Sequence, residues 1–194
     1  MTYDPPRPAG RLLLTPEDKD AAARLRRLRV LGLGERAEPV LDAFADRLAR
    51  TAAAPYAKVT FIGEEQQFFA GLHTPGRGGR AAGGAATAAG EPPVERRRGR
   101  DHGFCPHVVV RRKALVLEDV RDYPRFAGNA LVGEFGVRAY LGAPLIDGSG
   151  IALGAICVED VVPRPWGRPG LDTIKAMAAE LAGQLERRAA ATGI

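Results

Sequence analysis

The sequence is poor in aromatic side chains, in cysteine and in long hydrophobic runs. Aromatic residues make up 6% of the 194 positions, and there are two cysteines and one tryptophan. No apolar run approaches the roughly 20 residues that a membrane-spanning helix needs. The first residues lack the apolar core of a secretory signal peptide, because only Leu12, Leu13 and Leu14 stand together there. We therefore expect a cytoplasmic protein with no membrane association, in which both cysteines are reduced thiols.

Signatures of catalysis and metal binding are also missing. The sequence has no G-x-S-x-G elbow, no phosphate-binding loop and no dinucleotide fingerprint. A structural zinc site needs four ligands in recognisable pairs, and Cys105 and His107 have no second pair. The sequence therefore predicts neither a catalytic set nor a metal site, and it leaves any cofactor unknown.

The charge is unevenly distributed. The formal net charge is +5, which could indicate a nucleic-acid partner. Much of the surplus lies in a stretch rich in Gly, Ala and Arg at 74–100, without a basic recognition helix or aromatic stacking motif. We interpret this stretch as a flexible, solvated insertion and expect no nucleic-acid partner. Its arginines are Arg77, Arg80, Arg96, Arg97, Arg98 and Arg100.

The strongest local pattern is a hairpin at 136–160. Two apolar runs flank Asp147-Gly148-Ser149-Gly150, whose residues tolerate the positive φ angles of a tight turn. The preceding chain predicts a Pro-rich disordered tail at 1–15 and one domain at 16–190. Within that domain we expect a lead helix at 16–33, a helix at 38–51, a hairpin at 56–72, a short helix at 101–110, a strand at 113–119, a loop at 120–129 and a C-terminal helix at 171–188.

This order of elements predicts an α+β fold. A central antiparallel sheet of five to six strands would be covered by the helices at the two ends of the domain. From Leu25 onward the segments RLRRLRVLGL, PYAKVTFIGEEQQFF, HGFCPHVVVRRKALVLEDVRDYPRFAGNALV and GVRAYLGAPLIDGSGIALGAICVED resemble a GAF domain, a small-molecule and sensory fold related to PAS. The resemblance implies a sensory or regulatory domain that binds a small molecule without catalysis.

The resemblance also implies where a ligand would lie. The short helix and the loop before the last hairpin would close a cavity against the sheet, with polar groups orienting the ligand between apolar walls. An alternative is that Asp119, Arg125 and Arg138 pair with one another and hold the loop. The residues implied to line the cavity are Phe104, Cys105, His107, Asp119, Phe126, Asn129, Arg138, Tyr140 and Leu141.

Other functions stay open at this point. Cys105 could serve a reductase of the free methionine-sulfoxide type, although that branch places its nucleophile in the loop after the third strand, where this chain has no cysteine. Cys157 lies in an apolar strand and is most simply a small buried hydrophobe. His102 and His107 could ligate haem, although their spacing does not require it. A bilin attachment would need a surrounding motif that is missing.

The remaining alternative is an interaction module whose cavity is filled by its own side chains. In either case we expect a stand-alone domain that signals to a partner protein through its terminal helices. The same helices could form a homodimer.

Overall fold

A computed structural model describes residues 15–75 and 95–191. The predicted disordered tail, except for Thr15, and residues 76–94 of the predicted insertion lie outside the described residues. The elements are α1 (Ala21–Val30), α2 (Pro39–Ala52), β1 (Tyr56–Ile62), β2 (Gln66–His73), β3 (Arg97–Gly99), α3 (Cys105–Arg111), β4 (Leu115–Leu117), a 3₁₀ turn η1 (Val120–Asp122), α4 (Pro124–Ala127), α5 (Ala130–Phe135), β5 (Ala139–Ile146), β6 (Ala152–Asp160) and α6 (Gly167–Ala191).

The strands form one six-stranded sheet in the order β3-β2-β1-β6-β5-β4. Every neighbouring pair is antiparallel, and β1 and β6 form the central pair that joins the two halves of the chain. The predicted hairpin at 136–160 is confirmed as β5 and β6. Asp147 closes the turn by accepting hydrogen bonds from the backbone N–H groups of Ser149 at 3.0 Å and Ile151 at 3.1 Å. The predicted antiparallel α+β fold is therefore confirmed.

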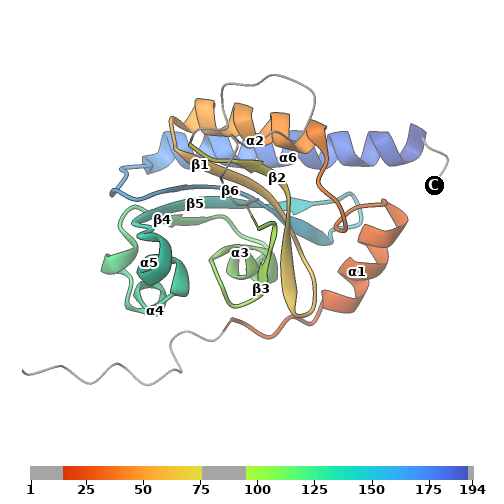
Figure 1. The fold of residues 1–194 in the computed structure, drawn as a ribbon. Coiled ribbons are helices and arrows are strands. Elements are labelled where there is room, and N and C mark those ends of the chain that lie inside the picture. Colours follow the sequence, from red (N-terminus) through yellow and green to blue (C-terminus); the bar gives the residue numbers. More distant parts are fainter. Residues whose placement is uncertain (1–14, 76–94, 192–194) are drawn as a thin grey trace, which may run out of the picture.

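The sheet is covered on both faces by different helices (Figure 1). The long helices α2 and α6 lie side by side over one face, which we call the helix side. The short elements α3, η1, α4 and α5, together called the roof, cover the opposite face, the roof side. Alternation along the strands sends Val59 and Phe61 into the helix-side core and Ile62 into the roof-side core.

The two terminal helices differ in extent from the prediction. The lead helix begins at Ala21 instead of near residue 16, because the Asp18 carboxylate accepts a hydrogen bond from the backbone N–H of Asp20, two residues further on, at 3.3 Å. A side chain that bonds the backbone locally competes with helix formation. The C-terminal helix begins earlier than predicted, at Gly167, whose N–H donates to Glu118 Oε1 at 2.9 Å.

The prediction that all of 74–100 is a solvated insertion is wrong at its end. Residues 97–99 form β3 and extend the sheet beside β2. Just before β3, Arg96 donates two hydrogen bonds of 2.9 Å to the Asp42 carboxylate and one of 3.0 Å to Phe69 O. The low-complexity composition of this stretch gave no sign of these contacts. An Arg guanidinium binds a carboxylate and carbonyls that lie elsewhere in the chain, and its local sequence does not specify them.

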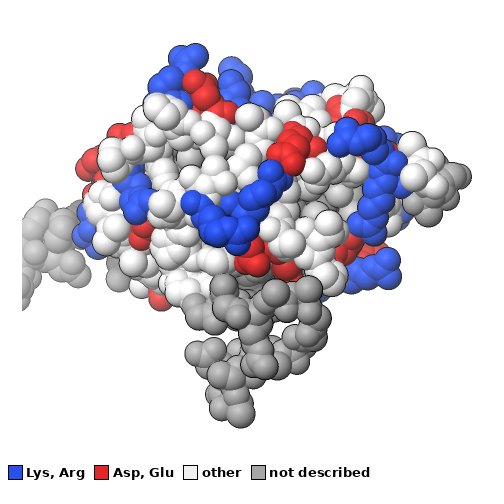
Figure 2. Space-filling view, turned by 90° about the horizontal axis from the view of Figure 1, so that it is seen from above, with Lys and Arg blue, Asp and Glu red and all other residues white. Residues whose placement is uncertain are grey.

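The surface of the helix side carries charge of both signs. Figure 2 looks onto this face and shows basic and acidic side chains interspersed among uncharged ones. One such pair joins α2 to α6, with Arg47 and Glu180 2.7 Å apart. Among the described residues of this face, charges of both signs thus alternate, without a continuous basic patch of the kind that binds nucleic acid. Within the described ranges, no helix combines the length and the hydropathy that crossing a bilayer would require.

Candidate functional site

The roof side of the sheet has a core of its own. Its buried residues come from the sheet and from all the roof elements, and they are separate from the core under α2 and α6. Small, branched and aromatic side chains share it: Ile62, Phe104, Cys105, Val108, Val109, Leu117, Val120, Phe126, Leu131, Val137, Tyr140, Ala152, Ala155 and Cys157.

Four of the nine residues predicted to line a cavity meet in the middle of this core. The ring centroids of Phe104 and Tyr140 are 5.0 Å apart, and Phe126 meets Phe104 edge-on at 5.9 Å. The Tyr140 hydroxyl donates to Cys105 Sγ at 3.4 Å. The sequence therefore placed these residues together correctly, but they pack against one another where a cavity was expected.

His107 lies at the edge of the same cluster. Its ring stands perpendicular to Phe126 at 5.1 Å, and only 4% of the residue is exposed. Burial, followed by the positive charges of Arg125 and Arg111, lowers the pKa of His107 to about 4. Its Nδ1 atom is buried and has no hydrogen-bond partner among the described residues. A neutral imidazole thus presents an unused polar atom inside the roof.

Asn129 holds the roof together. Its amide nitrogen donates to Gly103 O at 3.1 Å, and its amide oxygen accepts from Leu131 N at 3.1 Å, which caps the start of α5. Both ends of the side chain are thereby occupied by backbone groups. In this structure Asn129 fixes α5 to the segment before α3.

Asp119 and Arg138 pair with each other, which is one part of the alternative that also included Arg125. Arg138 Nε donates to Asp119 Oδ1 at 3.0 Å, and Arg138 Nη2 donates a second hydrogen bond to Asp119 Oδ2. The hydrogen bond from Arg138 lowers the pKa of Asp119 to about 2. Asp119 also accepts from Arg121 N at 3.1 Å and so caps η1. This pair ties together the two ends of the connection between β4 and β5, which contains η1, α4 and α5.

Leu141 lies on the wrong side of the sheet to line the predicted cavity. It belongs to the helix-side core, whereas its neighbour Tyr140 belongs to the roof-side core. Adjacent residues of a strand point to opposite faces, so both cannot line one cavity. As a result, β5 contacts both layers through neighbouring residues.

The prediction missed a polar group beside the thiols. Lys58 Nζ and Glu159 Oε2 are 2.6 Å apart, with side chains that are 13% and 6% exposed. Burial is the largest single effect and lowers the pKa of Lys58, but the charge and hydrogen bond of Glu159 and the two neighbouring cysteines together outweigh it, so the pKa of Lys58 is raised. Lys58 stands opposite Cys157 in the β1–β6 ladder. The signal in the sequence was the presence of charged residues in two largely apolar strands, Lys58 in β1 and Glu159 near the end of β6.

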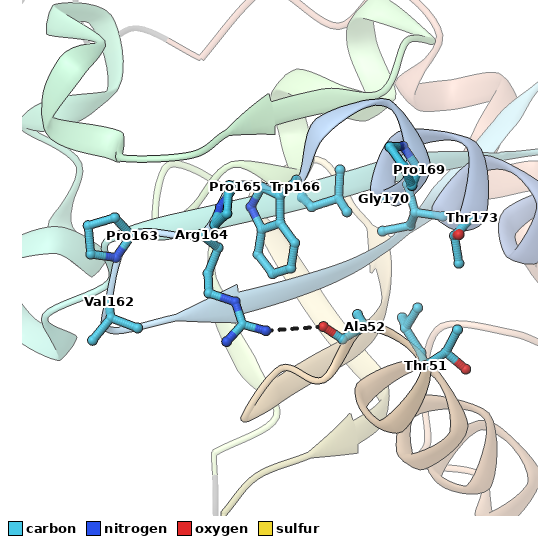
Figure 3. Close-up of a pocket in the computed structure, with 13 residues that line it drawn as sticks. Thr51, Ala52, Val162, Pro163, Arg164, Pro165, Trp166, Pro169, Gly170 and Thr173 are labelled. Atoms are coloured by element: carbon cyan, nitrogen blue, oxygen red, sulfur yellow. Dashed lines mark hydrogen bonds between the residues drawn. The ribbon is translucent and has the colours of Figure 1, made fainter.

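A groove of about 590 Å³ lies on the helix side, between the end of α2 and the start of α6. Figure 3 shows Trp166, three prolines and the last residues of α2 around it. Arg164 crosses the groove and donates to Ala52 O at 3.3 Å and Ala53 O at 2.6 Å, which satisfies carbonyls at the end of α2. This hollow was not predicted, and the sheet separates it from the roof-side cluster.

Comparisons with known proteins agree with this architecture. The GAF domain family model matches residues 36–185. A cyclic di-GMP phosphodiesterase of Pseudomonas aeruginosa is 38% identical over 66 residues, which are 34% of this chain and 11% of that protein. The match thus spans about a tenth of that relative's length.

Solved structures show the same fold at low identity. A methyl-accepting chemotaxis protein, residues 122 to 287, has a TM-score of 0.59 at 16% identity, covering 91% of this chain and 100% of that one. The GAF domain of an Acinetobacter phosphoenolpyruvate-protein phosphotransferase has a TM-score of 0.56 at 15% identity, covering 92% and 100%. Free methionine-R-sulfoxide reductase from Neisseria meningitidis has a TM-score of 0.52 at 17% identity, covering 92% and 96%. The chain belongs to the GAF domain family.

Proposed function

We propose that this GAF domain is a non-catalytic sensory module of the cytoplasm. It binds a small molecule on the roof side of the sheet and passes the change to a partner protein through its terminal helices. The observation that carries the proposal is the buried Nδ1 atom of His107, which has no hydrogen-bond partner among the described residues.

An unused polar atom at this position favours a ligand. Leaving a buried hydrogen-bonding group unsatisfied costs about 1–3 kcal/mol, and a ligand atom that bonds to Nδ1 would recover part of that cost. The roof is built of short elements, the longest of which is α3 with 7 residues. Such elements can shift on the sheet more easily than the sheet can deform, so a ligand would enter by displacing the roof.

The strand β5 offers a route from the roof to the helices. Tyr140 faces the roof and Leu141 faces α6, so one strand contacts both layers. A methyl group at Gly170 of α6 would lie 3.4 Å from Leu141 Cδ2, which shows how closely the helix packs there. A displacement of Tyr140 would therefore move Leu141 and shift the packing at the start of α6. Either a partner protein or a second copy of the chain could receive it there.

The ligand proposal is tested by native mass spectrometry on the chain purified from its host. We expect a mass above that of the polypeptide, which falls to the polypeptide mass after denaturation. The variant His107→Leu should lose the added mass, because it removes the polar atom. His102→Leu, which changes an exposed neighbour, should keep it. An absorbance spectrum of the same sample separates haem from a colourless ligand.

Other results of that experiment would count against the proposal. A wild-type chain that carries no added mass would favour the interaction module with a filled roof-side core. An adduct that survives His107→Leu but is lost when Trp166 is replaced would move the binding site to the helix-side groove.

The pKa of His107 predicts a pH dependence of stability. The unfolded state takes up a proton near the ordinary histidine pKa of about 6.5, whereas the folded state resists protonation until about pH 4. Lowering the pH through this window should therefore reduce the free energy of unfolding, by an amount on the order of 2 kcal/mol. Urea denaturation at several pH values measures it.

The matched variants isolate that contribution. His107→Gln should flatten the pH profile, and His102→Gln should leave it as in the wild type. Equal slopes for the wild type and His107→Gln would show that this imidazole is not held neutral in the folded state.

A thiol-based sulfoxide reductase is the rival function. It is favoured by the approach of Cys105 Sγ to within 3.5 Å of Cys157 Sγ. Against it, the rings of Phe104 and Tyr140 pack beside the thiols, where a substrate would have to bind. We therefore expect no turnover of free methionine sulfoxide with a dithiol reductant. Turnover that Cys105→Ser abolishes would establish the reductase in place of the sensor.

A further inference from the structure

The two cysteines of the chain meet under the roof. Cys105 is the first residue of α3, Cys157 lies in the central strand β6, and their sulfur atoms are 3.5 Å apart. A disulfide has an S–S distance of about 2.05 Å, so a shift on the order of 1.5 Å would join them. Neither cysteine is bonded in this structure.

The surroundings of the two thiols differ. Cys105 accepts a hydrogen bond from the Tyr140 hydroxyl at 3.4 Å, and 4% of the residue is exposed, whereas Cys157 is fully buried. Hydrogen bonds, first from Cys157 and then from Tyr140, lower the pKa of the Cys105 thiol against the effect of burial. The same contact with Cys105, together with burial, raises the pKa of Cys157. The arrangement thus favours Cys105 as the attacking sulfur and Cys157 as the resolving thiol.

We propose that Cys105 and Cys157 form a reversible disulfide when the protein meets a peroxide, and that this bond fastens the roof to the sheet. The proposal goes beyond the ligand-sensing function and holds whether or not a small molecule binds near His107.

The chemistry proceeds in two balanced steps. The Cys105 thiolate attacks one peroxide oxygen, the O–O bond breaks, and a sulfenic acid forms while the other oxygen leaves as water after taking a proton. The Cys157 sulfur then attacks Cys105 Sγ, the S–O bond breaks, and the hydroxyl leaves as water with the Cys157 proton. Hydrogen peroxide is thereby reduced, and the thiol pair is oxidised. A dithiol reductant reverses the change by exchange.

The bond would act on the elements already described. It would pull α3 toward β6, beside Phe104 and Tyr140, and close a loop of 52 residues. The oxidised protein is therefore expected to melt several degrees higher than the reduced one. An unchanged or lower melting temperature of the oxidised form would contradict the fastening of the roof.

Because the chain has two cysteines, an intramolecular disulfide can join only this pair. The folded, reduced chain is treated with hydrogen peroxide, then denatured, alkylated and weighed. We expect a product about 2 Da lighter that takes up no alkylating label, and a return to two labels after dithiothreitol. A wild-type chain that still takes up two labels after peroxide treatment in the folded state would overturn the proposal.

Single variants assign the two roles. Cys157→Ser should stop at a sulfenic acid on Cys105 that dimedone traps, whereas Cys105→Ser should leave Cys157 as a thiol. Tyr140→Phe, which keeps the ring and removes the hydroxyl, should slow oxidation several-fold. If Cys105→Ser oxidises as fast as Cys157→Ser, the assignment is wrong.

Discussion

Replacing Arg24 with methionine is expected to lower the free energy of unfolding by about 3 kcal/mol. Arg24 is 1% exposed although it lies in α1 among solvated arginines. Its Nε donates to Ile62 O at 2.8 Å, and its terminal nitrogens hold the Asp18 carboxylate. Removing the cation takes the Arg24 donor from a buried carbonyl. It leaves the buried Asp18 carboxylate with Arg100, at 3.4 Å, as its remaining ionic partner among the described residues. Urea denaturation monitored by circular dichroism measures the loss.

Arg26→Met is the matched control, because Arg26 is an exposed residue of the same helix. It should change the free energy of unfolding by less than about 0.5 kcal/mol. The double variant Arg24→Met, Asp18→Asn should be more stable than Arg24→Met alone, since it removes the uncompensated charge. Equal stability of the two single arginine variants would contradict the buried role of Arg24.

Replacing Gly71 with alanine is expected to destabilise the fold by about 3 kcal/mol or more. Gly71 lies in β2 directly under α2, and a methyl group there would come within 2.2 Å of Leu41 O. That atom belongs to the backbone of α2, so relief requires the helix to move off the sheet. Thermal denaturation and the urea midpoint both measure this effect.

Gly133→Ala is the matched control for Gly71. A methyl group at Gly133 in α5 would meet no atom within 4 Å. Because alanine is a better helix former, this change should be neutral or stabilise the protein by up to about 1 kcal/mol. A Gly71→Ala variant as stable as Gly133→Ala would contradict the close approach of α2 to β2.

The sheet was the most predictable part of the fold. Alternation on either side of Asp147-Gly148-Ser149-Gly150 sufficed for β5 and β6, because strand period and turn chemistry are both local. The start of α1 was mispredicted. Thr15-Pro16 has the pattern of a helix start, but the Asp18 side chain accepts hydrogen bonds from the backbone N–H of Asp20 and from Arg24, and the helix begins only after Asp20. β3 was missed, because residues 97–99 have no strand pattern of their own and form a strand only by pairing with β2.

The sequence brought part of the candidate cluster together but did not specify how its side chains pack. Phe104, Cys105, Phe126 and Tyr140 were expected together and are in contact. That their side chains fill the space depends on how the rings pack, which single residues in a sequence do not specify. The thiol contact was missed for a related reason. Cys157 was interpreted alone, while its approach to Cys105 depends on where α3 lies over β6.

Hydrogen–deuterium exchange tests the central claim most directly: that a roof-side ligand acts through β5 on α6. The chain purified from its host is compared with the same chain refolded free of ligand. The account predicts slower exchange in α3, α4 and α5 and altered exchange in α6 in the host-purified chain, with β1 and β6 unchanged in both. Identical exchange in the two preparations, or differences confined to the groove around Trp166, would contradict it.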